Sequence, residues 1–241
     1  MGYDVTIVLC TVNEVKNLPI LVGKIEENAK FDYELVFEDD GSTDGTREFI
    51  MEYARNNQNV GYFFYPNKRS LLIAEYSGFK HSNGSFIIKM DADLQHPGEK
   101  LSEIYEKLNE GYDIVVASRY VDGGSTGRRE PLRGLVSRFA EFYAKLFLAG
   151  AKKTTDPLSG YFGFKRGLKL EVNERWRGYK SLLFLLSSNP DAKVKDVPYK
   201  FLERADGTSK IVGSAEFMRI YLSEIILAKR LEVKNRKRAT F

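Results

Sequence analysis

Two carboxylates one residue apart, Asp91 and Asp93, end an apolar segment of strand character in the stretch SFIIKMDADLQHP. A turn or helix cap needs only one carboxylate, and two acids this close repel each other unless a cation lies between them. Together with the amide of Gln95 they offer hard oxygen ligands, which suit Mg²⁺ or Mn²⁺, ions that are often shared with substrate phosphates. The residues therefore predict a metal site at Asp91, Asp93 and Gln95.

Two further polar clusters, TVNE at Thr11–Glu14 and EDDGSTDGT at Glu38–Thr46, also follow segments of strand character directly. Each alone could be a turn or a helix cap. Three such clusters would meet at one edge of a parallel sheet, outside the carboxyl ends of its strands, where ligands bind. Neither cluster contains a phosphate-binding glycine motif. A nucleotide held there would therefore use carboxylates for its base and ribose, and a metal for its diphosphate.

The elements that position these clusters alternate along the first half of the chain. This alternation predicts an α/β fold with a mostly parallel, doubly wound (Rossmann-like) sheet flanked by helices. The expected strands are Val5–Cys10, Tyr33–Phe37, Val60–Tyr65, Phe86–Met90 and Ile114–Ala117, and the expected helices are Leu18–Ala29, Thr46–Asn56, Leu71–His81 and Gly98–Asn109.

The second half follows a different pattern. The stretch RYVDGGSTGRREP after Ser118 is too long for an ordinary connection and is a candidate functional loop. The sequence then predicts, in order, a helix at Leu132–Leu148, the loop KKTTDPLSGYFGFKRG, a short helix near Tyr179–Ser187, a strand at Val194–Tyr199 and a long helix at Ser214–Lys237. We expect a catalytic domain over residues 1–212 and an amphipathic, basic, membrane-proximal helix over 213–241.

Composition sets the broad class of protein. The chain has 241 residues, of which 43% are hydrophobic, enough for the core of one domain. Its single cysteine, Cys10, excludes a disulfide framework and favours a cytosolic or cytosol-facing protein. No apolar run reaches the ~18 residues of a membrane span, and the N-terminus does not resemble a signal peptide. Six of the residues at 229–241 are basic and one is acidic, while the rest of the chain is near neutral, a pattern common for a solvated terminus. We expect no nucleic-acid partner.

At this point the sequence resembles a known family. The stretches TVNEVKNL, DDGSTDGT, DADLQHP, GYDIVVASRY, LRGLVSR, DPLSGYFGFKR, GYK and RADGTSK resemble the inverting glycosyltransferases of GT-A fold, and among them the polyprenyl-phosphate sugar synthases such as dolichol-phosphate mannose synthase. The resemblance covers roughly residues 4–211. DADLQHP together with R-x-x-G-x-S-K is its most specific part.

The resemblance implies a role for each matching residue. The nucleotide-sugar pocket would be lined by Thr11, Asn13, Glu14 and Ala92, with Asp39 and Asp40 on the base and ribose side. Asp91, Asp93 and Gln95 would hold the metal. Arg119, Arg133, Arg204 and Lys210 would surround the diphosphate and acceptor phosphate, with Ser209 supporting them, so that the catalytic set is Asp91, Asp93, Arg119, Arg133 and Arg204. Two departures are Cys10-Thr11-Val12 where the family has Pro-Thr-Tyr, and Phe184 in place of an acid.

The expected chemistry suits a lipid phosphate as acceptor. A hydroxyl acceptor needs a general base, whereas a phosphate is already anionic near neutral pH and needs positioning by cations such as Arg. Neither His81 nor His96 is an obvious base. We therefore expect one in-line displacement with inversion, which moves a hexose, with mannose from GDP-mannose favoured, to a dolichyl or polyprenyl phosphate. The product would be β-linked.

Other readings stay open. One is a UDP-glucose-dependent enzyme with a polyprenyl-phosphate or polysaccharide acceptor, although a polysaccharide synthase would be expected to show Gln-x-x-Arg-Trp. Others are a nucleotidyltransferase and a non-catalytic nucleotide-sugar-binding protein at the membrane. The apolar stripe of the last helix could bind the cytoplasmic side of a membrane peripherally, with help from its basic end, or it could pack on the body or form a homo-oligomer. The stripe comprises Phe217, Ile220, Tyr221, Ile225, Leu227 and Leu231.

Overall fold

The computed structural model describes residues 2–67, 69–127, 131–173, 175–202 and 215–239, and for residues 131–135, 215 and 236–239 it describes only the backbone. Within these ranges one seven-stranded sheet has the order β3-β2-β1-β4-β6-β5-β7. β1 pairs in parallel with β2 and β4, β2 with β3, and β5 with β7, which confirms the mostly parallel sheet. The strands are β1 (Val5–Thr11), β2 (Tyr33–Asp40), β3 (Val60–Tyr65), β4 (Phe86–Asp91), β5 (Ile114–Ser118), β6 (Phe162–Lys165) and β7 (Val194–Pro198).

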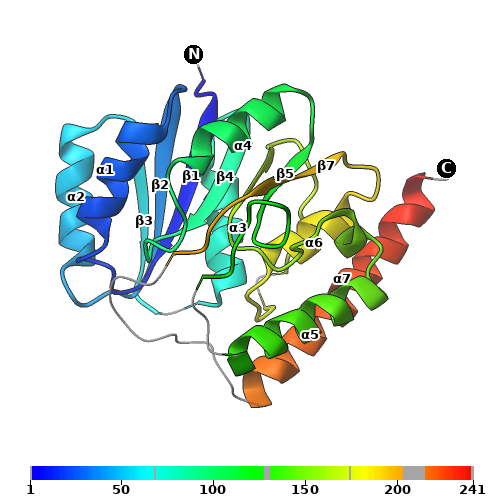
Figure 1. The fold of residues 1–241 in the computed structure, drawn as a ribbon. Helices are drawn as coiled ribbons and strands as arrows, with labels where there is room; N and C mark the ends of the chain where they lie inside the picture. The colour runs from blue at the N-terminus through cyan, green and yellow to red at the C-terminus, as the bar shows by residue number, and fades with distance from the viewer. Residues whose placement is uncertain (1, 68, 128–130, 174, 203–214, 240–241) are drawn as a thin grey trace.

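Helices cover both faces of the sheet (Figure 1). α1 (Leu18–Asn28) and α4 (Lys100–Asn109) share one core with the strand residues Ile7 and Ile88. α3 (Leu71–His81) and α6 (Ser181–Ser188) share the opposite core with Val8 and Ile87. Because successive strand side chains point to opposite faces, adjacent residues such as Ile87 and Ile88 belong to different cores. α2 (Thr46–Asn56) lies next to β3.

One strand was not expected from the sequence. β6 lies inside the segment KKTTDPLSGYFGFKRG, for which we predicted a loop, and it runs antiparallel between β4 and β5. It is only four residues long and carries Gly163, which weakens its strand signal. Glycine is required at position 163 because α4 packs closely on the strand there, and a Cβ at Gly163 would lie 2.5 Å from Ile104 Cγ2. The same segment contains the short 3₁₀ helix η1 (Gly150–Lys153).

The last helix packs on the body of the protein. α7 (Ala215–Ala239) lies beside α5 (Pro131–Phe147) and contacts α6 (Figure 1). Tyr221, Ile225 and Leu231 of the expected apolar stripe are buried in a third core, formed with α5, α6 and η1. Of the alternatives left open for the stripe, packing on the body is therefore the correct one for these three residues. In the described ranges no helix is both long and apolar enough to span a bilayer.

Two buried carboxylates attach α7 to loops of the body. Glu224 Oε1 accepts the backbone N–H groups of Tyr179 and Lys180 at 2.6 and 2.9 Å, just before α6 begins. Glu232 Oε1 accepts the N–H of Gly150 at 2.7 Å, at the start of η1. Both side chains therefore satisfy backbone donors at the start of a helix, which would otherwise have no intrahelical partner.

The Glu224 carboxyl should make stability depend on pH. Burial raises its pKa from 4.5 to about 7, although the N–H groups of Tyr179 and Lys180 lower it. A folded-state pKa above the unfolded one means that the stabilisation is complete below about pH 4.5 and is lost as the pH rises through about 7, by roughly 3 kcal/mol. In urea unfolding at pH 5 and pH 8, Glu224→Gln should flatten this dependence, whereas the exposed Glu27→Gln should not. Equal pH dependence in E224Q and the wild type would contradict the assignment.

Candidate active site

A cavity of about 1030 Å³ opens at the carboxyl ends of β1, β2 and β4. Thr11, Val12 and Glu14 line it from the β1 side, and Asp91, Ala92 and Asp93 from the β4 side. α3 supplies another wall. The far wall consists of the segment before α6 and the first turns of α7, and its residues are Arg175, Trp176, Arg177, Tyr179, Glu216 and Ile220. The three polar clusters identified from the sequence thus lie at one sheet edge, and each contributes residues to this cavity.

The first carboxylate after β2, Asp39, is engaged within the protein. Its partner in the β1–β2 register, Thr11, donates a hydrogen bond to its Oδ2 at 2.9 Å. Arg47 Nε donates to Oδ1 at 2.7 Å, and the hydroxyl and N–H of Ser42 donate as well. Burial would raise the pKa of Asp39, but the hydrogen bonds from Ser42, Arg47 and Thr11 lower it. Asp39 is fully buried and does not line the cavity, so its contact with a nucleotide stays a prediction.

The two loops after β1 and β2 are bonded to each other. Asn13 has a left-handed backbone with φ 56°, and its N–H donates to Ser42 Oγ at 2.8 Å while its Oδ1 accepts the N–H of Thr43 at 2.9 Å. The N–H of Glu14 donates to Thr46 Oγ1 at 2.9 Å. These bonds hold Glu14 on the cavity wall. They place Asn13 between the loops, and it is not among the lining residues.

Asp40 shares a cation with Glu38 at the end of β2. The guanidinium of Arg69 contacts Asp40 Oδ1 at 2.7 Å and Glu38 Oε2 at 2.9 Å, and it lies 3.2 Å from the centre of the Tyr65 ring. His81 Nδ1 lies 2.7 Å from Glu38 Oε1, so this histidine is engaged in a structural contact. Arg69, Asp40 and Glu38 all line the cavity. Sequence reasoning missed Arg69, because it lies in the loop after β3, where no motif marks it.

Asp91, at the end of β4, is held by a buried lysine. Lys89 Nζ lies 2.5 Å from Asp91 Oδ1 and 2.8 Å from Oε1 of Glu75 on α3. Lys89 and Glu75 are each at most 2% exposed, whereas the Asp91 side chain is 37% exposed. Burial would raise the pKa of Asp91, but Lys89 and His96 lower it to about 2. Asp91 is therefore ionised at neutral pH.

His96 supports the turn after β4. Its Nδ1 accepts the N–H of Asp91 at 2.9 Å, and its Nε2 lies 3.6 Å from Asp91 Oδ2. Burial lowers the pKa of His96 to about 4, so the ring is neutral at pH 7 and carries its hydrogen on Nε2. The ring stacks on Tyr161 with centroids 5.0 Å apart. These contacts make His96 a residue that positions Asp91.

The remaining metal-motif residues surround the same turn. The N–H of Gln95 donates to Asp93 Oδ1 at 3.2 Å, and the Gln95 side-chain amide donates to the carbonyl of Leu202 at 3.1 Å. Leu94 has a left-handed backbone with φ 64°, within the bend that follows β4. Asp93 lines the cavity and Gln95 does not. Among the described residues, no three His, Cys, Asp or Glu side chains gather as a metal cluster.

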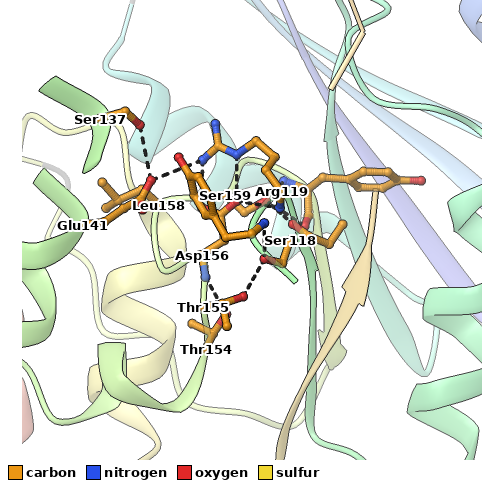
Figure 2. Close-up of polar contacts among 12 residues, drawn as sticks. Ser118, Arg119, Ser137, Glu141, Thr154, Thr155, Asp156, Leu158 and Ser159 are labelled. Atoms are coloured by element: carbon orange, nitrogen blue, oxygen red, sulfur yellow. Dashed lines mark hydrogen bonds and ion pairs between the residues drawn. The ribbon is translucent and has the colours of Figure 1, made fainter. Parts of the chain in front are cut away.

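Arg119 forms a buried ion pair at the end of β5. Its Nε and Nη2 each donate to Asp156 at 2.7 Å, and its backbone N–H donates to the same carboxylate at 3.2 Å (Figure 2). A second carboxylate, Oε1 of Glu141 on α5, lies 4.0 Å from Arg119 Nη2. Burial would lower the pKa of Arg119, but Asp156 raises it. Arg119 does not line the cavity, so its contact with a phosphate stays a prediction.

Four predicted phosphate residues cannot be placed in this geometry. Arg204, Ser209 and Lys210 lie outside the described residues, and Arg133 lies on α5 in a stretch whose side chains are not described. Their roles remain predictions. On the far wall, Arg175 and Arg177 are exposed, and sequence reasoning did not select them. Phe184, which replaces an acid of the family pattern, is fully buried and packs on Trp176 with ring centroids 5.5 Å apart.

Comparisons with known proteins agree with this geometry. The family model for Glycosyl transferase family 2 matches residues 6–176. The dolichol-phosphate mannosyltransferase of Saccharomyces cerevisiae is 30% identical over 227 residues, which cover 88% of this chain and 83% of that protein. The polyprenol monophosphomannose synthase of Mycolicibacterium smegmatis is 33% identical over 218 residues, covering 86% and 81%.

A third relative is longer. The dolichol-phosphate mannosyltransferase of Pyrococcus furiosus is 33% identical over 214 residues, which cover 88% of this chain and 60% of that protein. Among solved structures, glucosyl-3-phosphoglycerate synthase from Mycobacterium tuberculosis, in complex with Mn²⁺ and UDP-glucose, superposes with a TM-score of 0.69 at 16% identity and covers 93% of this chain and 80% of that chain. This likeness confirms the GT-A fold.

Proposed function

Because the chain belongs to glycosyl transferase family 2, among the relatives of the dolichol-phosphate mannosyltransferases, we propose that it transfers mannose from GDP-mannose to a polyprenyl phosphate with inversion. The observation that carries the proposal is the cavity in which Asp91 and Asp93 face the polar ends of β1 and β2. Named relatives act on dolichol phosphate or polyprenol, and this supports the lipid acceptor.

The donor would lie along the sheet edge. Its base and ribose would occupy the part lined by Thr11, Glu14 and Asp40, and its diphosphate would reach Asp91 and Asp93. Arg69 holds Asp40 and Glu38 in place and brings a fixed positive charge to that part of the cavity. A carboxylate held in this way can accept hydrogen bonds from a base N–H group or a ribose hydroxyl, and this supports a nucleotide at this part of the cavity.

The residues at the turn fit a divalent metal. Asp91 and Asp93 supply hard carboxylate oxygens on the cavity wall. Gly160 packs closely against this motif, because a Cβ there would lie 2.9 Å from Asp91 Oδ2 and 3.2 Å from Lys89 Nζ. A bound Mg²⁺ or Mn²⁺ would stabilise the charge that develops on the leaving diphosphate. Asp91 and Asp93 would hold it, and Gln95, whose amide nitrogen is bonded to the Leu202 carbonyl, would support the turn or offer its oxygen.

No histidine needs to act as a base in this proposal. His81 and His96 are both engaged in structural contacts. A phosphate acceptor attacks as an anion, so the chain has to position it and offset its charge. Arg133, Arg204 and Lys210 are proposed for this role. One in-line attack on an α-linked donor then gives a β-linked sugar phosphate.

The test is to offer GDP-mannose, UDP-glucose and UDP-GlcNAc, each with a polyprenyl phosphate and Mn²⁺. Turnover with GDP-mannose and a β-linked product by NMR are expected. Turnover with UDP-glucose would favour the second candidate, a polyprenyl-phosphate glucosyltransferase, which the UDP-glucose complex of a structural neighbour brings into consideration. An α-linked product would refute inversion, and turnover with none of the donors would favour a non-catalytic binding protein.

The membrane surface required by a lipid acceptor is proposed to be the outer face of α5 and α7. Phe139 and Phe142 of α5 are 61% and 63% exposed, and Ile226 of α7 is 55% exposed. Between the two helices lies an apolar pocket of about 250 Å³. The other exposed apolar residues of this face are Val136, Leu146, Phe147, Met218, Leu222 and Val233. Large exposed apolar patches mark interaction sites, and the basic residues of α7 suit an anionic bilayer.

Phe139→Glu combined with Phe142→Glu should weaken binding to anionic vesicles at least tenfold. In the proposed complex both rings insert into the bilayer, and the variant replaces them with carboxylates, which are costly to bury in lipid. Vesicle sedimentation measures this, and turnover with a short-chain, water-soluble acceptor should be retained. The matched control is Ile20→Glu on α1, which is also half exposed. Unchanged vesicle binding in F139E/F142E would refute this surface.

A further inference from the structure

A lysine in the middle of an apolar strand is the unusual feature of β4. Side chains two residues apart on a strand point to the same face, so Ile87, Lys89 and Asp91 share the face that α3 covers. Ile87 is buried in the core there. Lys89 is 2% exposed, and it lies two residues before Asp91, whose carboxylate lines the cavity.

The buried charge of Lys89 has two anionic partners. Nζ lies 2.8 Å from Glu75 Oε1 and 2.5 Å from Asp91 Oδ1. A buried cation is costly unless it is paired, so Glu75 accounts for its stability inside the protein. Glu75 is itself buried, and its Oε2 has no hydrogen-bond partner in the part of the chain that the structure describes. Glu75 therefore balances the charge of Lys89, and Lys89 in turn contacts Asp91, which lines the cavity.

This arrangement changes what Asp91 can offer a metal. One of its oxygens, Oδ1, already contacts a permanent cation, and the other, Oδ2, lies 3.6 Å from Nε2 of His96. A divalent ion at Asp91 would be repelled by the ammonium group a few ångströms away. The diphosphate of the donor would offset that repulsion with its own negative charge.

We propose that Lys89 is a built-in counter-ion of the metal motif, which keeps free divalent metal weakly bound until a nucleoside diphosphate arrives with it. This inference rests on the proposed metal role of Asp91 and Asp93. It makes Lys89 a positioning residue, and it makes metal and nucleotide uptake strongly coupled. Because coupling is reciprocal, the nucleotide must raise metal affinity by the same factor as the metal raises nucleotide affinity.

The experiment measures Mn²⁺ binding by the purified chain, by electron paramagnetic resonance of free Mn²⁺, with and without GDP or UDP. The double variant Glu75→Met with Lys89→Met removes both members of the buried pair and leaves apolar side chains. We expect it to bind Mn²⁺ alone at least tenfold more tightly than the wild type, with a smaller gain on adding nucleotide. A purely structural role of Lys89 would give no such tightening.

Glu75→Gln tests the opposite direction and keeps Lys89 in place. Without the carboxylate of Glu75, Lys89 should interact more strongly with Asp91. The affinity of the chain for Mn²⁺ in the absence of nucleotide should therefore fall. The control is Lys107→Met with Glu110→Gln, which removes a surface pair 2.7 Å apart on and beside α4. Equal or weaker Mn²⁺ binding by E75M/K89M, or tighter binding by E75Q, would overturn the inference. Absence of Mn²⁺ binding in every variant, with nucleotide present, would instead refute the metal assignment itself.

Discussion

Asp91→Ala and Asp93→Ala should each lower kcat/KM for sugar transfer by on the order of 10³-fold or more, because each would remove a proposed ligand of the ion that we propose to stabilise the leaving diphosphate. Both carboxylates line the cavity. Asp91 is held in place by Lys89, which contacts its carboxylate, and by His96, which accepts its backbone N–H. The measurement is the initial rate with GDP-mannose, Mn²⁺ and a polyprenyl phosphate.

Two controls make this result specific. Asp191→Ala removes an exposed acid far along the chain, after α6, and should leave the rate unchanged. Asp91→Asn retains the size of the side chain, so a loss of activity without a change in melting temperature would indicate lost charge. Wild-type rates in both D91A and D93A would show that the metal is bound elsewhere or is not required.

Arg119→Met should destabilise the fold by about 3–5 kcal/mol, because it leaves the carboxylate of Asp156 buried without its cation. Asp156 is fully buried and accepts three hydrogen bonds from Arg119. A loss of this size corresponds to a fall in Tm of roughly 10 °C for a chain of this length. Thermal melting followed by circular dichroism measures it.

The control for this prediction is Arg166→Met, which removes an exposed arginine after β6. The double variant Arg119→Met with Asp156→Leu removes both charges and should recover most of the lost stability. Its activity then separates the two roles of Arg119. Turnover near the wild-type rate would show that Arg119 is structural, whereas a stable but inactive protein would support the predicted contact with phosphate. An unchanged Tm in R119M would contradict the importance of the pair.

The sequence by itself determined most strands of the sheet and the sheet edge at which the polar clusters meet. Apolar segments of strand length marked six of the seven strands that the described residues form, β1 to β5 and β7, and the helices between the first five, because period and length are local properties. The clusters at Thr11, Asp40 and Asp91 met at one edge as expected, since parallel strands bring their carboxyl ends together. β6 was missed because four residues with a glycine carry almost no strand pattern.

Only the tertiary structure decided what each charged group is paired with. Asp39 and Asp40 are neighbours in the sequence, yet one is buried against Arg47 and the other lines the cavity with Arg69. Lys89 and Glu75 lie on different elements, so no local pattern could pair them. Which face of α7 is buried depends on the shape of α5 and α6 beside it, since both its faces carry apolar residues. Burial and pairing arise from segments far apart in the chain, and they set the charge that each of these groups presents to a ligand.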